Sequence, residues 1–161
     1  MTNPVSAPAP RAEQWYLDDM TVGRVHPGLS KTITEADFLA FAALTGDDHP
    51  IHYDEAFAKR SRFGGRVAHG LLLMAHTALG ATGLSRHLED SMIAFVGQDC
   101  RFLKPVLIDD HIRSELEVAE VAPKPGRDFG KLTFIVRLIN QRDETVLEGH
   151  HEYLFRLRPT A

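Results

Sequence analysis

The sequence predicts an α+β fold in which a curved antiparallel sheet wraps around a buried central helix. The segment from His69 to Gly83 is apolar almost all round, which is typical of a helix buried in a core. From Met92 onward the apolar residues follow a period of two, which is typical of antiparallel strands with one solvent-exposed face. An apolar helix and a sheet with one apolar face bury each other when the sheet curls around the helix.

The elements before the central helix are predicted from caps and turns. Residues 24–32 predict a short strand or extended entry. Thr34 and Asp37 form a capping box, and Gly46 is placed to end the helix that the box begins. A loop over 47–53, a helix over 55–60 capped by Asp54, and a loop over 61–67 follow. The apolar face of the first helix is expected to comprise Phe38, Phe41, Ala42 and Leu44.

The second half of the chain is predicted to supply most of about four or five strands. Apolar and polar residues alternate over 112–118, 132–138 and 147–157, and the turn over 123–128 joins two of these strands. A single curved sheet covers only one side of the helix. We therefore expect a second copy of the chain to cover the other side, in a homodimer or a dimer of dimers.

Composition favours a single cytoplasmic domain that binds neither nucleic acid nor membrane. The chain has 161 residues, a net charge of −4 and a pI of about 6.1, so no basic face for nucleic acid is expected. The single cysteine excludes an internal disulfide and fits a reducing compartment. The longest apolar run, over 70–84, falls short of the roughly 20 residues of a membrane span. Residues 1–14 are expected to be a disordered lead-in, and 15–161 to form the domain.

Candidate chemistry concentrates between Thr45 and Asp54. This stretch holds three carboxylates and two histidines, and Pro50 stiffens its middle. Asp47 and His52 flank that proline and could be aimed at one small molecule. Because imidazole titrates close to neutral pH, such a pair can move protons on and off water. A role of Asp47 in closing the turn is the structural alternative.

Two segments carry a resemblance to a known family. The first contains Gly46-Asp47-Asp48-His49-Pro50-Ile51-His52, and the second contains His69-Gly70 at the expected start of the central helix. Together with their spacing, they closely resemble the MaoC-like hot-dog proteins, which include the R-specific enoyl-CoA hydratases. Residues 98–106 resemble the strand that follows the helix in that family. The family pattern has Asn where His49 stands, and some hydratases carry a serine where Ala78 stands.

The resemblance implies a hot-dog fold and the reversible hydration of a trans-2-enoyl-CoA to the R-3-hydroxyacyl-CoA. Asp47 and His52 would hold and activate the water, and the backbone N–H of Gly70 would stabilise the thioester oxygen. The implied substrate-binding residues are His49, Val67, His69 and Leu71. The resemblance implies no metal or redox cofactor. Coenzyme A enters the reaction as part of the substrate.

Two other functions remain open from the residues. A hot-dog thioesterase would use a carboxylate and water to cleave the thioester. A non-catalytic acyl-CoA-binding module would bind the same ligand without chemistry. The arginines at 60, 62 and 66 either meet the CoA phosphates or belong to a solvated loop.

Overall fold

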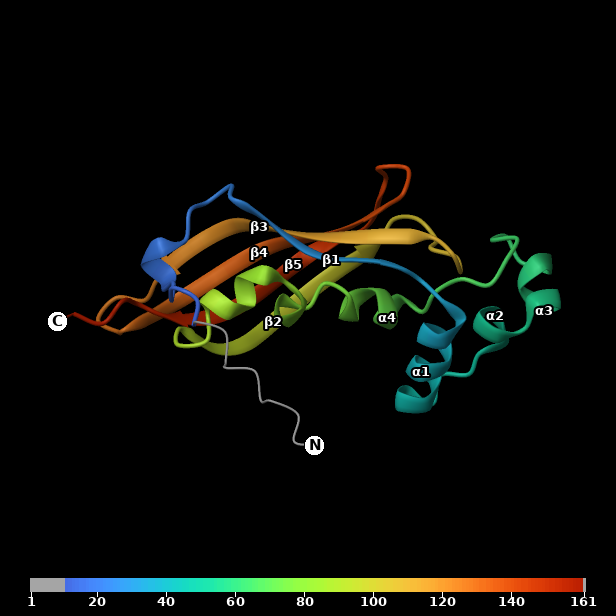
Figure 1. Ribbon diagram of the computed structural model, residues 1–161, viewed down its shortest axis with the longest axis horizontal. Helices are drawn as coiled ribbons and strands as arrows, with labels where there is room; N and C mark the ends of the chain where they lie inside the picture. The colour runs from blue at the N-terminus through green and yellow to red at the C-terminus, as the bar shows by residue number, and fades with distance from the viewer. Residues whose placement is uncertain (1–10, 161) are drawn as a thin grey trace, which may run out of the picture.

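The fold is built on one five-stranded antiparallel sheet with the strand order β1-β3-β4-β5-β2. This computed structural model describes residues 11–160. The strands are β1 (Val25–Thr32), β2 (Met92–Phe102), β3 (His111–Pro123), β4 (Phe129–Asn140) and β5 (Thr145–Arg156). The helices are α1 (Glu35–Thr45), α2 (Pro50–Tyr53), α3 (Glu55–Arg60) and α4 (Gly70–Ala75), with 3-10 turns η1 (Leu17–Asp19), η2 (Leu79–Ala81) and η3 (Gly83–His87). The helix α4 lies along one face of the sheet, and α1 to α3 cluster beyond one end of it (Figure 1).

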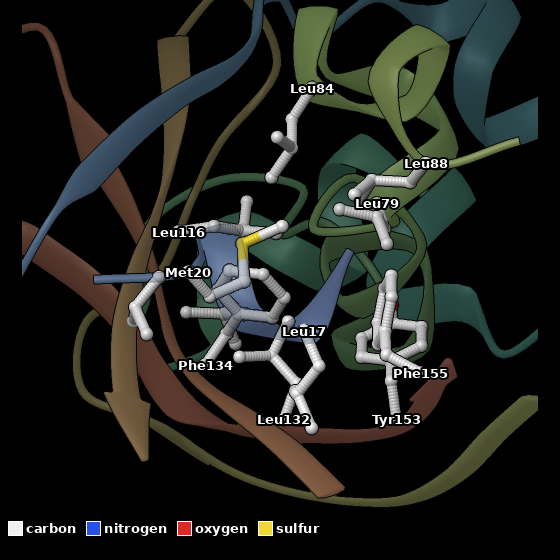
Figure 2. Packing of buried hydrophobic residues seen from close by; sticks show 12 residues of the cluster. Leu17, Met20, Leu79, Leu84, Leu88, Leu116, Leu132, Phe134, Tyr153 and Phe155 are labelled. Atoms are coloured by element: carbon white, nitrogen blue, oxygen red, sulfur yellow. The ribbon is translucent and has the colours of Figure 1, made fainter. Parts of the chain in front are cut away.

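The inner face of the sheet is built by the predicted alternation. On β4, Leu132, Phe134, Val136 and Leu138 are fully buried, while Arg137 on the outer face pairs with Glu117 and Glu148 of the neighbouring strands. Three leucines cover one half of the inner face (Figure 2). They are Leu79 of η2, Leu84 of η3 and Leu88, which directly follows η3. The period-two prediction is confirmed, because Leu132, Phe134 and Val136 pack against this cover and Leu138 is buried in a second cluster.

A second apolar cluster fixes the part of the fold that carries the candidate site. Phe38 of α1 and Leu72 and Leu73 of α4 pack with Ile112 and Leu138 of the sheet. Phe38 is fully buried. The cluster therefore holds α1 and α4 against the same end of the sheet, and the loops between them are confined to one place.

The first helix begins and ends where its caps predict. Thr34 and Asp37 form the reciprocal capping box, and Gly46 adopts a left-handed conformation with φ of 76° at the helix C-terminus. The predicted apolar face is only partly correct. Leu44 is 84% exposed, because α1 lies beyond the end of the sheet and only one side of it meets the core (Figure 1).

The prediction of one continuous helix from His69 to Gly83 is wrong. The α-helix ends at Ala75, and the chain continues in 3-10 turns. The Thr77 hydroxyl donates to the Met74 carbonyl at 2.7 Å, and the Thr77 N–H bonds the same carbonyl at 3.0 Å. These bonds to the residue three positions earlier tighten the turn, and the glycines at 80 and 83 have low helix propensity.

Two smaller predictions also need correction. The segment over 47–53 is not entirely a loop, since α2 forms one helical turn that begins at Pro50. The central helix is not buried all round, since Leu71 is 62% exposed within one chain. That exposure lies on the side of α4 that the sheet of the same chain does not cover.

The predicted disordered lead-in over 1–14 falls largely outside the described residues. Within residues 11–14, Arg11 pairs with Asp90 at 2.5 Å, and Gln14 bonds the Arg86 carbonyl and the Asp90 N–H. These contacts tie the start of the described chain to η3 and the loop after it. No helix in the described range is both long enough and apolar enough to cross a membrane.

We expect Gly149→Ala to destabilise the fold. A Cβ at Gly149 would lie 2.0 Å from the Asp99 carbonyl oxygen and 2.7 Å from the Cys100 Cα, both of which are backbone atoms of β2. Such overpacking forces β5 and β2 apart and costs about 1–3 kcal/mol of unfolding free energy. Urea denaturation monitored by circular dichroism measures it. The control is Gly80→Ala, where an added Cβ meets no atom within 4 Å and the stability should hold.

Candidate active site

The structure brings Asp47, His52 and His69 together at the N-terminal end of α4. Asp47 follows the glycine that ends α1, His52 lies in α2, and His69 immediately precedes α4. One carboxylate or ring-nitrogen atom from each residue lies within 4.8 Å of the others. The two predicted catalytic residues therefore meet, and His69 joins them.

The ring of His52 is held in one orientation and one tautomer. Its Nδ1 lies 2.7 Å from the Val67 carbonyl oxygen. A carbonyl only accepts hydrogen bonds, so Nδ1 carries the proton in neutral His52. The second nitrogen, Nε2, is then the unprotonated one and can take a proton from a neighbouring group.

His69 is a buried ring that supports His52. It is 2% exposed, and its ring stacks on that of His52 with centroids 3.8 Å apart and planes 25° apart. Phe38 and Phe41 contact it from the core, at centroid distances of 5.3 Å and 4.7 Å. Burial lowers the pKa of His69, and the neighbouring His52 lowers it further, against an opposing effect of Asp47. His69 is therefore neutral near pH 7.

Tyr53 is the site residue that the sequence interpretation missed. Its hydroxyl lies 2.8 Å from Nε2 of His69, 2.9 Å from the Phe38 carbonyl oxygen and 3.1 Å from the Asp47 carbonyl oxygen. It thus joins α1, the loop after it and the start of α4. The signal available in the sequence was its position directly after His52, because a tyrosine that is half buried generally finds a partner for its hydroxyl.

The same contacts decide where the proton of His69 lies. Both carbonyls can only accept, and the single proton of Tyr53 goes to one of them. Nε2 of His69 is therefore the donor to the phenol oxygen. Nδ1 is left as an unprotonated acceptor, buried and without a hydrogen-bond partner among the residues described.

The cluster is poorly arranged to bind a metal ion. An ion bound to an imidazole lies in the ring plane, about 2.0–2.1 Å from the nitrogen. Two rings stacked 3.8 Å apart cannot both direct lone pairs in their own planes at one ion unless a ring turns. The donor set of one carboxylate and two imidazoles suits a metal, but the orientation of its rings does not.

His49, the departure from the family pattern, forms a cap. Its Nδ1 accepts a hydrogen bond from the Ile51 N–H at 3.2 Å, at the start of α2. Its ring meets His52 edge to face, with centroids 6.3 Å apart. Asp54 caps α3 through the Phe57 N–H at 2.9 Å, as predicted. The cap leaves only Nε2 of His49 for any contact with substrate.

Val67 and Gly70 line a cleft of about 290 Å³ beside the cluster. Phe102 covers the Cα of Gly70 so closely that a Cβ there would lie 2.7 Å from its Cζ. Arg62 and Lys104 also line the cleft. Arg66 does not, because it forms ion pairs with Glu35 at 2.8 Å and Glu55 at 3.3 Å.

Leu71 faces a second cavity, of about 430 Å³, between α4 and the strands β2 and β5. Adjacent residues at the start of α4 thus line two different hollows, Gly70 the cleft and Leu71 the cavity. The remaining lining residues are Met74, Ala75, Ala78, Leu79, Gly80, Met92, Phe95, Gln98, His151 and Tyr153. Most of this wall is apolar, as a site for an aliphatic chain requires.

A carboxylate and an imidazole meet at the start of α4, and their neighbours Val67, Gly70 and Leu71 line the two hollows. The scaffold thus brings together two groups of the kind that acid-base chemistry uses. The chain belongs to the MaoC-like dehydratase family, since the family described as MaoC like domain matches residues 21–135. The chain is 37% identical to a 3-hydroxybutyryl-CoA dehydratase of Methylorubrum extorquens over 87% of this chain and 83% of that protein. It is 31% identical to an (R)-specific enoyl-CoA hydratase of Rhodospirillum rubrum over 68% of this chain and 73% of that protein.

Solved structures agree on the fold. A monoamine oxidase regulatory protein from Archaeoglobus fulgidus superimposes with a TM-score of 0.84 at 36% identity, covering 92% of this chain and 99% of that one. A Mycobacterium tuberculosis protein described as a double hot-dog fold matches with a TM-score of 0.74 at 21% identity, covering 92% of this chain and 46% of that one. The fold is the hot-dog fold, as the sequence predicts.

We expect the stability of the protein to fall as the pH drops below about 6.5. Burial lowers the pKa of His69 in the folded state, and His26, His76 and His151 shift in the same direction for the same main reason. Below pH 6.5 the unfolded chain, whose histidines have pKa values near 6.5, therefore binds more protons than the folded chain does. The stability is complete above that pH and is lost progressively toward the lowered folded pKa values.

Denaturant unfolding at pH 8, 6.5 and 5.5 measures this effect. His69→Gln removes one of the four groups and should make the loss of unfolding free energy between pH 8 and 5.5 smaller. An equal loss in the variant and in the wild type would contradict the assignment of a neutral, buried His69.

Proposed function

We propose that this protein catalyses the reversible hydration of a trans-2-enoyl-CoA to the R-3-hydroxyacyl-CoA. The observation that supports this most is the meeting of the Asp47 and His52 side chains at the start of α4. Relatives named as a 3-hydroxybutyryl-CoA dehydratase and an (R)-specific enoyl-CoA hydratase support the choice of substrate.

In the proposed reaction Asp47 and His52 hold one water between the carboxylate and Nε2. The bond from Nδ1 to the Val67 carbonyl keeps Nε2 available for this. The pair takes one proton from the water as its oxygen bonds to C3, and one proton is given to C2. The protonation state of the protein is therefore unchanged after each turnover. Positioned acid-base groups contribute about 10²–10⁴-fold to such a step.

The proposed donor to the thioester oxygen is the backbone N–H of Gly70. As the first residue of α4, Gly70 has no acceptor for its N–H within the helix. The thioester oxygen gains negative charge as C3 is attacked, so this donor interacts more strongly in the transition state than with bound substrate. Loss of one comparable donor in other enzymes costs about 10²–10³-fold.

The two hollows on either side of α4 suit the two parts of the substrate. We assign the CoA part to the 290 Å³ cleft, where Arg62 offers positive charge to phosphates, while Lys104 in the same wall is paired with Glu144 at 2.5 Å. The acyl chain is assigned to the apolar 430 Å³ cavity that begins at Leu71. The proposed chemistry needs neither a metal nor a redox cofactor.

Asp47→Asn is expected to lower kcat for crotonyl-CoA hydration by about 10²–10⁴-fold, because the amide cannot exchange a proton with water. The loss of enoyl absorbance measures the rate. The matched control is Asp48→Asn at the next residue, which is also exposed and should keep the wild-type rate. An Asp47→Asn variant with full activity would refute the mechanism.

The same assay separates the three candidate functions when free thiol is followed in parallel. Loss of enoyl absorbance without thiol supports the hydratase, whereas release of thiol identifies a thioesterase. A protein that binds crotonyl-CoA and changes neither signal is a binding module. Treatment with EDTA should leave the hydration rate unchanged.

We also propose that two copies of the chain associate through β2 and the uncovered side of α4. Among residues 11–160, β2 forms an edge of the sheet and pairs with β5 alone. About half of the surface of each large apolar side chain on it is exposed, namely Met92, Ile93, Phe95, Val96 and Phe102. An edge strand of this composition is a template for pairing with another strand, and Leu71 of α4 extends its apolar surface.

Val96→Glu should therefore weaken the dimer, because it places a charge in the proposed interface. Size-exclusion chromatography with light scattering over a range of concentrations measures the shift toward monomer. Val22→Glu is the control, since Val22 is also exposed, at 60% against 50% for Val96, but lies in the turn before β1. A wild-type chain that is monomeric at every concentration would refute the proposal.

A further inference from the structure

The cavity assigned to the acyl chain has one polar corner that hydration chemistry does not require. His151 of β5 lies in its wall and is 5% exposed. Gln98 of β2 also lines the cavity and pairs directly opposite His151 in the β2–β5 register. The two side chains are thus cross-strand neighbours on a wall that is otherwise mainly apolar.

The hydrogen bonds of His151 define what it can offer to a ligand. Its Nε2 lies 3.2 Å from the Thr77 hydroxyl oxygen, and that hydroxyl donates its own proton to the Met74 carbonyl at 2.7 Å. Thr77 must therefore accept from His151, which places the proton of the ring on Nε2. Nδ1 remains as an acceptor, and it is buried without a partner among the described residues.

The corner also excludes ionic groups. Burial lowers the pKa of His151, so the ring is neutral near pH 7. None of the residues that line the cavity is a lysine or an arginine. A carboxylate at the end of an acyl chain would lose its hydration here without gaining a countercharge, which is strongly unfavourable.

A hydroxyl group matches both members of the corner. It can donate to Nδ1 of His151, which has no partner among the described residues, and accept from the exposed side-chain amide of Gln98. A methyl group would leave Nδ1 unpaired, and a ketone would lack the proton that Nδ1 needs. We propose that the acyl cavity selects enoyl-CoA substrates whose chain carries a hydroxyl group, recognised by His151 and Gln98. This inference rests on the proposed function.

The test compares matched substrates with and without a terminal hydroxyl. Pairs such as 2-hexenoyl-CoA and 6-hydroxy-2-hexenoyl-CoA, from five to eight carbons, are assayed for kcat/KM of hydration. Calorimetric titration of the saturated esters, hexanoyl-CoA and 6-hydroxyhexanoyl-CoA, measures binding without turnover. We expect the wild type to favour the hydroxylated member by about tenfold at the chain length that reaches the corner.

Two variants and one control assign the preference. His151→Leu should abolish or reverse it, and Gln98→Leu should reduce it. Because Gln98 lies on β2, in the proposed dimer interface, light scattering checks that this variant keeps the oligomeric state of the wild type. His150→Leu is the matched control, because His150 is the next residue, points to the outer face and bonds Asp99 at 3.2 Å. The control should keep the wild-type ratio.

The outcomes distinguish this inference from the proposed function. Hydration of plain enoyl-CoA with no preference for a hydroxyl at any chain length overturns the inference alone. A preference that survives in both His151→Leu and Gln98→Leu also overturns it. Failure to hydrate any enoyl-CoA overturns the proposed function, while the binding ratio of the saturated esters still decides whether a hydroxyl is recognised.

Discussion

The inner face of the five-stranded sheet must be covered, and this requirement governs the rest of the molecule. The chain between β1 and β2 supplies most of the cover, from Phe38 in α1 to Leu88 after η3. That segment is folded against one face of the sheet. Its polar groups lie at the edge of the apolar clusters, because burial inside them would remove the groups from water. The candidate site is therefore located where the cover begins, at the end of the sheet that α1 and α4 share (Figure 1).

A polar cluster at the edge of a core must satisfy its own hydrogen bonds. Tyr53 does this for three segments at once, since its hydroxyl meets the Phe38 and Asp47 carbonyls and the ring of His69. His69 in turn stacks on His52, whose other side is held by the Val67 carbonyl. Each bond removes a choice of tautomer or rotamer. The result is a preorganised imidazole beside a carboxylate, which is what proton transfer requires.

The same cover is incomplete within one chain. The helix α4 has only six residues, so the side of it that carries Leu71 and the apolar residues of β2 stay exposed. The 430 Å³ cavity lies under this uncovered side. The proposed dimer and the proposed acyl site thus share one physical origin, which is apolar surface that a short helix cannot bury. A second copy would close the cavity and fix the length of chain that it accepts.

Local chemistry determined a large part of this protein. The capping box at Thr34 and Asp37, the left-handed Gly46, the cap at Asp54 and the alternation of β3 to β5 are short-range rules, and the structure follows them. The pairing of Asp47 with His52 was also predictable, because a stiff turn of four residues separates them and the family motif contains both.

Tertiary structure alone decided the rest. The helix predicted over 69–83 stops at Ala75, and Thr77 just beyond it meets His151 of the sheet at 3.2 Å as well as bonding back to Met74. His69 and His151 became buried neutral rings through the elements that fold over them, and periodicity carries no information on hydrogen-bond partners. Sequence thus determined which groups are present near the site. Packing decided their protons, because burial and the nearest donor or acceptor set the tautomer of each ring.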